Sequence, residues 1–135
     1  MSGNDDGEDP IFSEALSAPP GLAVRILDLS GANGSDPVEV VRGFRSVAHA
    51  NAFARRYVRD SLDRCRARGM AAEAVLEVWF AYGEDAEVAG AGDEGWKSAT
   101  ELHAFAEAPA PDPEERNWRV IDPRREEEDE EGEEE

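Results

Sequence analysis

The chain has one cysteine, Cys65, and one lysine, Lys97, among its 135 residues. A single cysteine cannot form a disulfide within the chain, which is typical of proteins kept in a reducing compartment. No apolar run approaches the roughly 20 residues needed to span a bilayer, and the acidic start of the chain does not resemble a signal segment. We therefore expect a cytoplasmic protein without a membrane partner.

Motifs for metals and cofactors are equally scarce. Neither His49 nor His103 has a histidine or cysteine partner at a spacing typical of metal sites. Residues 90–95 read GAGDEG, a GxGxxG pattern that also occurs in dinucleotide-binding turns. However, two acids inside this segment would repel phosphate, and Trp96 displaces Lys97 from the position of a P-loop lysine. We interpret 90–95 as a loop and predict no cofactor and no metal.

Charge is distributed very unevenly along the chain. The formal net charge is −18, and nine of the last ten residues are acidic. Such segments bury too little apolar area to offset the entropy of ordering, so we predict that 1–20 and 123–135 are disordered. A single domain over 21–122 remains. The preference for arginine over lysine there is typical of a GC-rich bacterial genome.

The middle of the chain predicts an α+β fold. Partial alternation over 22–29 and 38–44, with turn residues between them, indicates a β-hairpin. Residues 46–68 have a helical period, with Ser46 as the N-cap and Gly69 beyond the end. The apolar stretch 74–82 (AVLEVWFAY) predicts a central strand.

Weaker signals complete the expected fold. Residues 84–89 are a candidate short strand, and Ser98 and Glu101 have the spacing of a capping box that opens a helix to about 107. Residues 118–122 are either an edge strand or a packing anchor. The order β-β-α-β-(β)-α predicts a small two-layer sandwich, with a mainly antiparallel sheet and one long helix across it.

The helix at 46–68 is basic, although the protein is acidic. One side of its helical wheel is apolar, and the other carries arginines that we expect to be exposed. Three pairs at i,i+4 spacing, Arg56–Asp60, Arg59–Asp63 and Asp60–Arg64, would neutralise part of this charge. Residues that could contact a partner are the arginines in and around this helix and one tryptophan of the predicted central strand: Arg42, Arg45, Arg55, Arg59, Arg66, Arg68 and Trp79.

Three functions remain open from the sequence. The first is a small, acidic, non-enzymatic accessory or regulatory module that binds another protein, because no convergent catalytic set is visible. The second is a nucleic-acid-binding protein that uses the arginine face of 46–68 and is gated by its acidic tail. The third is a small enzyme with a carboxylate site near Glu77, beside Trp79. A homo-oligomer is compatible with each.

Overall fold

The computed structural model describes residues 18–125, so the predicted disorder of 1–17 and 126–135 lies outside the described residues. The strands are β1 (Ala23–Asp28), β2 (Glu39–Val41) and β3 (Glu84–Ala89), and the helices are α3 (Val47–Arg64), α4 (Ala72–Tyr82) and α5 (Leu102–Glu107). Short 3-10 turns occupy Gly92–Glu94, Ser98–Thr100, Pro113–Arg116 and Arg119–Ile121. The α+β class is confirmed.

The sheet has three antiparallel strands in the order β2-β1-β3. β1 is central and pairs along its whole length with β3, from Ala23 opposite Ala89 to Asp28 opposite Glu84. Side chains alternate between the two faces, so Val24 and Ile26 are buried toward α3 while Arg25 points away. The hairpin and the short strand at 84–89 are therefore confirmed.

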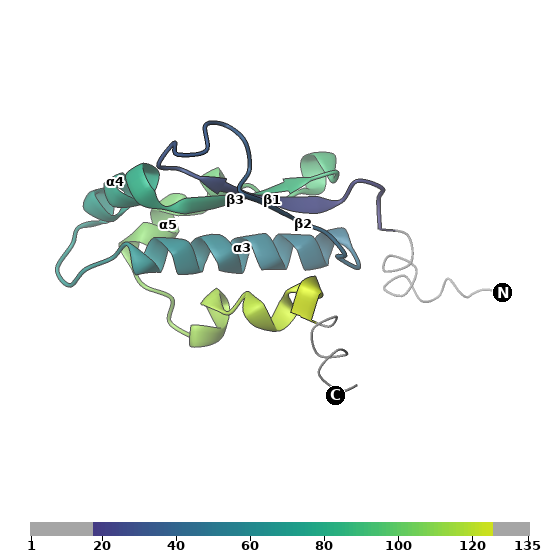
Figure 1. Cartoon of the computed structure of the whole chain (residues 1–135). Helices are drawn as coiled ribbons and strands as arrows, with labels where there is room; N and C mark the ends of the chain where they lie inside the picture. The colour runs from purple at the N-terminus through teal and green to yellow at the C-terminus, as the bar shows by residue number, and fades with distance from the viewer. Residues whose placement is uncertain (1–17, 126–135) are drawn as a thin grey trace, which may run out of the picture.

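α3 lies across the buried face of the sheet (Figure 1). Ser46 caps it as expected, because its hydroxyl accepts a 3.1 Å hydrogen bond from the His49 amide. The helix ends at Arg64, four residues before the predicted end. Phe53, Val58 and Leu62 are fully buried against the sheet and α4.

The predicted central strand at 74–82 is wrong, because these residues form α4. The segment buries Val75 and Trp79, which share one face of a helix, whereas Glu77, which a strand would place on the same face as both, is exposed. β1 already has a partner on each side, so the sheet offers no central position to this segment. α4 packs instead against α3 and α5 at one end of the molecule (Figure 1).

The predicted capping box is also wrong in detail. Ser98 begins a 3-10 turn, and α5 follows at Leu102 without a side-chain cap. The carboxylate of Glu101 instead accepts hydrogen bonds from Arg55 and Trp96. The expected helix does bury Leu102 and Phe105.

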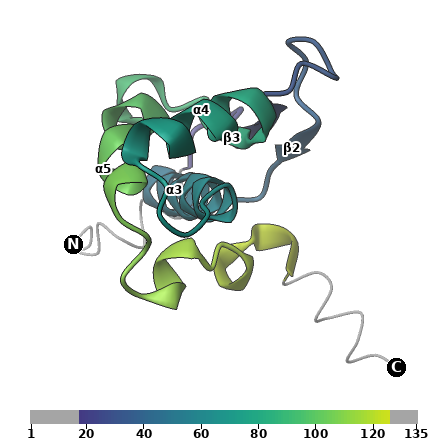
Figure 2. The ribbon, with the colours of Figure 1, turned by 90° about the vertical axis from the view of Figure 1, so that its left-hand side faces the viewer.

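The segment after α5 returns along the side of α3 that faces away from the sheet, as Figures 1 and 2 show. Trp118 anchors it, since its ring packs at 4.9 Å from the Tyr57 ring and 5.7 Å from the Phe53 ring, measured between centroids. The segment is held as far as Arg124, which makes ion pairs with Asp122 and Glu39. α3 is thus covered on two sides.

Candidate functional site

The arginine side of α3 is an internal interface in this structure, and the expectation that it is an exposed stripe is wrong for Arg59. This residue is only 7% exposed. Its guanidinium donates a 3.0 Å hydrogen bond to the Ala108 carbonyl and lies 4.4 Å from the ring centroid of Phe105. Burial lowers the pKa of Arg59, while the charge of Asp63 opposes that change. Arg59 therefore holds the end of α5 against α3.

Two further arginines serve the same contact. Arg66 donates to the carbonyls of Ala106 at 2.9 Å and Phe105 at 2.6 Å, where a helix end leaves carbonyls without partners. Arg55 binds Glu101 through two nitrogens, at 2.5 and 3.1 Å. These hydrogen bonds raise the pKa of Arg55 and lower that of Glu101.

The acids of α3 hold the returning segment rather than pair mainly within the helix. Asp60 accepts a 2.8 Å hydrogen bond from Arg116, and Asp63 accepts a 3.0 Å bond from the Ala110 amide. Of the three predicted i,i+4 pairs, only Asp60–Arg64 is present among the described residues, at 3.5 Å. Arg56 and Arg59 donate instead to carbonyls beyond α5.

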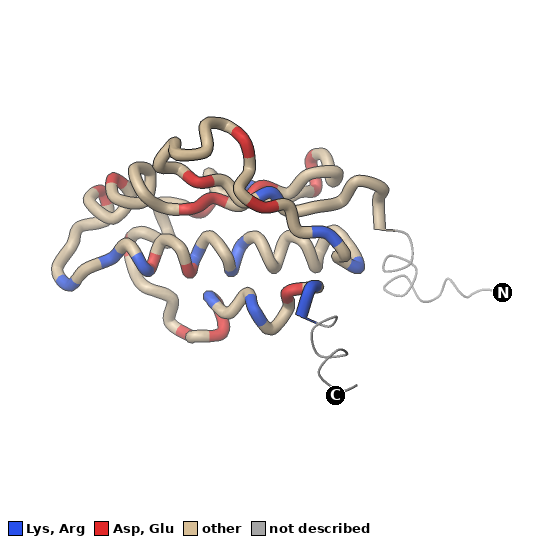
Figure 3. The backbone as a smooth tube through the Cα atoms, viewed as in Figure 1, with Lys and Arg blue, Asp and Glu red and all other residues tan. Residues whose placement is uncertain are grey.

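The remaining predicted contact residues are scattered. Arg42 and Arg68 are exposed and make no ion pair within residues 18–125. The Arg45 amide donates to His49 Nδ1 at 3.1 Å. Trp79 is 1% exposed and belongs to the core, so a contact surface around it is wrong. Basic positions are spread along α3, along the segment that returns beside it and in loops at both ends of the molecule, with acidic positions between them (Figure 3).

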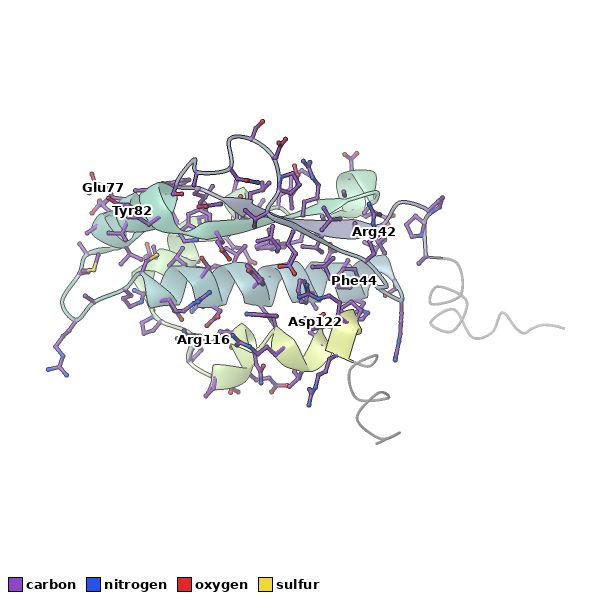
Figure 4. The ribbon with its side chains drawn as sticks, in the orientation of Figure 1. Arg42, Phe44, Glu77, Tyr82, Arg116 and Asp122 are labelled. Carbon is purple, nitrogen blue, oxygen red and sulfur yellow. The ribbon has the colours of Figure 1, made fainter. Side chains whose placement is uncertain are left out.

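The most exposed aromatic side chains lie on α4. Phe80 is 56% exposed and Tyr82 is 76% exposed. Glu73 and Glu77 are exposed on the same helix, and Figure 4 shows Glu77 and Tyr82 at the end of the molecule that is farthest from the two ends of the described chain. Glu77 therefore lies on an open helix surface, and this position does not desolvate its carboxylate.

Contacts on the buried side of α4 fix its position against α3. Trp79 Nε1 donates a 3.1 Å hydrogen bond to Ser61 Oγ, and the same oxygen accepts from the Glu84 amide at 2.9 Å. The Phe80 ring packs edge-on against Trp79, with 5.1 Å between ring centroids. Gly83 follows, and a Cβ there would lie 2.3 Å from the Trp79 ring. Phe80 thus stands on a rigid base, while Tyr82, two residues further on, points from another side of the last turn of α4.

A concave feature lies where β1 and β3 meet the segment 92–99. It is a cavity of about 420 Å³ lined by Leu27, Asp85, Val88, Trp96 and Lys97, among others. Partial burial raises the pKa of Asp85, while hydrogen bonds with the Ser98 side chain and the Ala86 amide stabilise the ionised carboxylate and oppose that rise. Within residues 18–125, Asp85 has no ion-pair partner.

Comparison with protein-family models, curated proteins and solved structures finds no match. Within the described range, no group of three or more histidine, cysteine, aspartate or glutamate side chains could hold a metal ion. No helix in that range is both long and apolar enough to cross a membrane. A functional assignment therefore rests on the geometry and chemistry of this structure alone. The fold defines a small α+β protein.

The sequence pattern missed Phe80, Tyr82 and Asp85 as candidates. The alternation assigned to 74–82 placed Phe80 and Tyr82 on a covered sheet face, because apolar residues stand on both sides of this stretch. A helical wheel of the same residues would have separated Trp79 from Glu73, Glu77 and Phe80. Asp85 carries no such signal, since its burial depends on segment 92–99 folding back over β3.

Proposed function

We propose that this protein is a non-enzymatic accessory module that binds another protein through the exposed face of α4. The observation that carries the proposal is the exposure of Phe80 and Tyr82 on a short, rigidly held helix. Large exposed aromatic groups at a fixed position are typical of binding anchors, because little conformational freedom is lost when they are buried.

The chemistry of the face indicates the kind of partner. α4 has 11 residues, about 16 Å of helix, which fits a groove that receives an amphipathic helix. Glu73 and Glu77 lie on the same side of the helix as Phe80, because successive members of this set are three or four residues apart. The complementary surface is an apolar groove with arginine or lysine on its rim.

A second copy of the chain fits this face less well. A two-fold contact between α4 helices places the same surface on both sides, so the acidic groups of one copy approach those of the other. Like charges that face each other across an interface weaken it. A basic partner removes this repulsion, and it also gains from the net charge of −18 during the encounter.

The two alternative functions are less well supported than protein binding through α4. Hydrogen bonds within the chain already engage the guanidinium groups of Arg55, Arg59 and Arg66. Fewer donors are therefore available to a nucleic-acid backbone. Glu77 is exposed on α4 and does not line the cavity at Asp85. These contacts and positions favour the α4 proposal over both alternatives.

Site-specific photo-crosslinking tests the proposal. A photoreactive residue is placed at Phe80 or Tyr82 in the full chain, with Arg42 and Val120 as matched exposed control positions. We expect one protein adduct from the two α4 positions and none from the controls. Its crosslinked peptide should lie in an apolar groove with a basic rim.

Binding of the purified partner then tests the charge argument. Substituting Glu73→Lys together with Glu77→Lys should weaken binding at least tenfold, and Phe80→Ala should do so without any change of charge. Adducts from Arg42 or Val120 alone, a self-adduct, or unchanged affinity in both variants would overturn the proposal.

A further inference from the structure

The carboxylate of Asp85 is partly withdrawn from water and makes no ion pair within the described chain. A carboxylate in such a position is stabilised by a cation or by several donors, because burial disfavours its charged form. The Ala86 amide donates a 2.8 Å hydrogen bond to Oδ1 and the Ser98 side chain is a second partner, which still leaves acceptor capacity on the carboxylate. The residue also lines the 420 Å³ cavity, so a ligand can reach this feature from solvent.

The charged groups around Asp85 limit what the cavity can hold. Glu87 also lines it, but its carboxylate is already bound by Arg25 at 2.8 Å. Lys97 contributes an ammonium group to the lining, though it makes no ion pair with Asp85. A single available carboxylate does not suit a divalent metal, which needs several oxygen ligands.

Part of the remaining wall is apolar. Leu27 extends from β1 on the same sheet face as Asp85, since the two are paired across the strands. Trp96 continues the lining, and its ring is fixed because its Nε1 donates to Glu101 at 2.9 Å. An apolar body with one positive end complements a cavity that combines these walls with a single carboxylate.

We propose that the cavity between β3 and segment 92–99 binds a monovalent organic cation, with an ammonium group on Asp85 and a short alkyl body against Leu27 and Trp96. The same chemistry is present in a free aliphatic amine and in a lysine side chain of another protein. This inference is independent of the α4 surface, because the two sites share no residue.

Titration with n-pentylamine, followed by NMR of the full chain, tests the proposal. We expect shifts at Asp85, Trp96 and Ser98, together with much weaker binding of n-pentanol, which has the same alkyl body without the charge. Asp85→Asn should reduce pentylamine affinity at least about tenfold, the scale of a hydrogen bond to a charged group. Asp36→Asn, in the exposed turn after β1, is the matched control and should bind as the wild type does.

The wild-type protein supplies a second readout that needs no substitution. Amine affinity should fall as the pH is lowered and Asp85 becomes protonated, because the neutral carboxyl group cannot form the ion pair. Nα-acetyl-lysine methylamide distinguishes the sources: comparable affinity indicates a lysine side chain, and binding of pentylamine alone indicates a free amine. Equal binding of pentanol, unchanged affinity in Asp85→Asn, or no binding of pentylamine would each overturn the proposal.

Discussion

The guanidinium of Arg59 lies 4.4 Å from the ring centroid of Phe105, on the side of α3 that the charge pattern predicts to be exposed. The contact joins the middle of α3 to the last turn of α5 and excludes water from both. It makes Arg59 part of the interior, although the residue belongs to the most basic stretch of an acidic chain. Arginine suits this position because a planar cation can stack on an aromatic ring and donate to a carbonyl at the same time.

Arg59→Ala should therefore destabilise the protein. It removes the hydrogen bond to Ala108 and the stacking on Phe105, which together correspond to about 2–3 kcal/mol. Chemical denaturation measures the loss in the free energy of unfolding. Arg42→Ala is the matched control and should change stability by less than about 0.5 kcal/mol, because this arginine is exposed. Equal effects of the two substitutions would contradict the assignment of Arg59 to the interior.

Ser61→Ala should loosen the base of α4. The substitution leaves both Trp79 Nε1 and the Glu84 amide without their acceptor, at a cost of about 2–3 kcal/mol. Trp79 fluorescence should change together with stability. Ser30→Ala, in the exposed turn after β1, serves as the control and should leave both readouts near the wild-type values. Unchanged stability in Ser61→Ala would show that α4 does not depend on this contact.

Local sequence patterns predicted the hairpin, the long helix and the short strand at 84–89, because each has a clear period or a turn beside it. They failed at α4, since the short apolar run 74–82 fits a strand and a helix equally well. Tertiary contacts decide between them: Trp79 reaches Ser61 only from a helix that packs on α3. Intrinsic β preference is weak against such contacts.

The contacts of the arginines could not be predicted from sequence patterns for a different reason. Their acceptors are mainly backbone carbonyls, such as those of Phe105, Ala106 and Ala108, which every residue type possesses. Only the return of the chain after α5 brings these carbonyls to α3. The proline-containing segment that makes this return has no period that would predict its path.

The Arg55–Glu101 contact should make stability depend on pH in the acidic range. Because the pKa of Glu101 is lowered in the folded state, its contribution is present above the unfolded value of about 4.3 and is lost as the pH falls through the folded value. The difference in unfolding free energy between the wild type and Glu101→Gln should shrink across that window. Glu107→Gln, an exposed position on α5, should show no such trend. A constant difference between pH 7 and pH 2 would contradict this role.

Asp85 should behave in the opposite sense. Burial raises its pKa in the folded state, so the stability linked to this group is present below the usual aspartate value and is lost as the pH rises through the folded value. Asp85→Asn should therefore be at least as stable as the wild type at pH 7, as chemical denaturation can measure. A loss of more than about 1 kcal/mol would assign a structural role to the Asp85 charge.

Chemical labelling of the arginines tests most directly whether the basic side of α3 is an internal interface. Phenylglyoxal modifies accessible guanidinium groups, and mass spectrometry of the native full-length protein gives the rate at each position. We expect rapid modification of Arg42 and Arg68, with Arg59 and Arg66 protected until the protein unfolds. Modification of Arg59 and Arg66 as fast as that of Arg42 would contradict the buried arginine contacts and restore an exposed basic face.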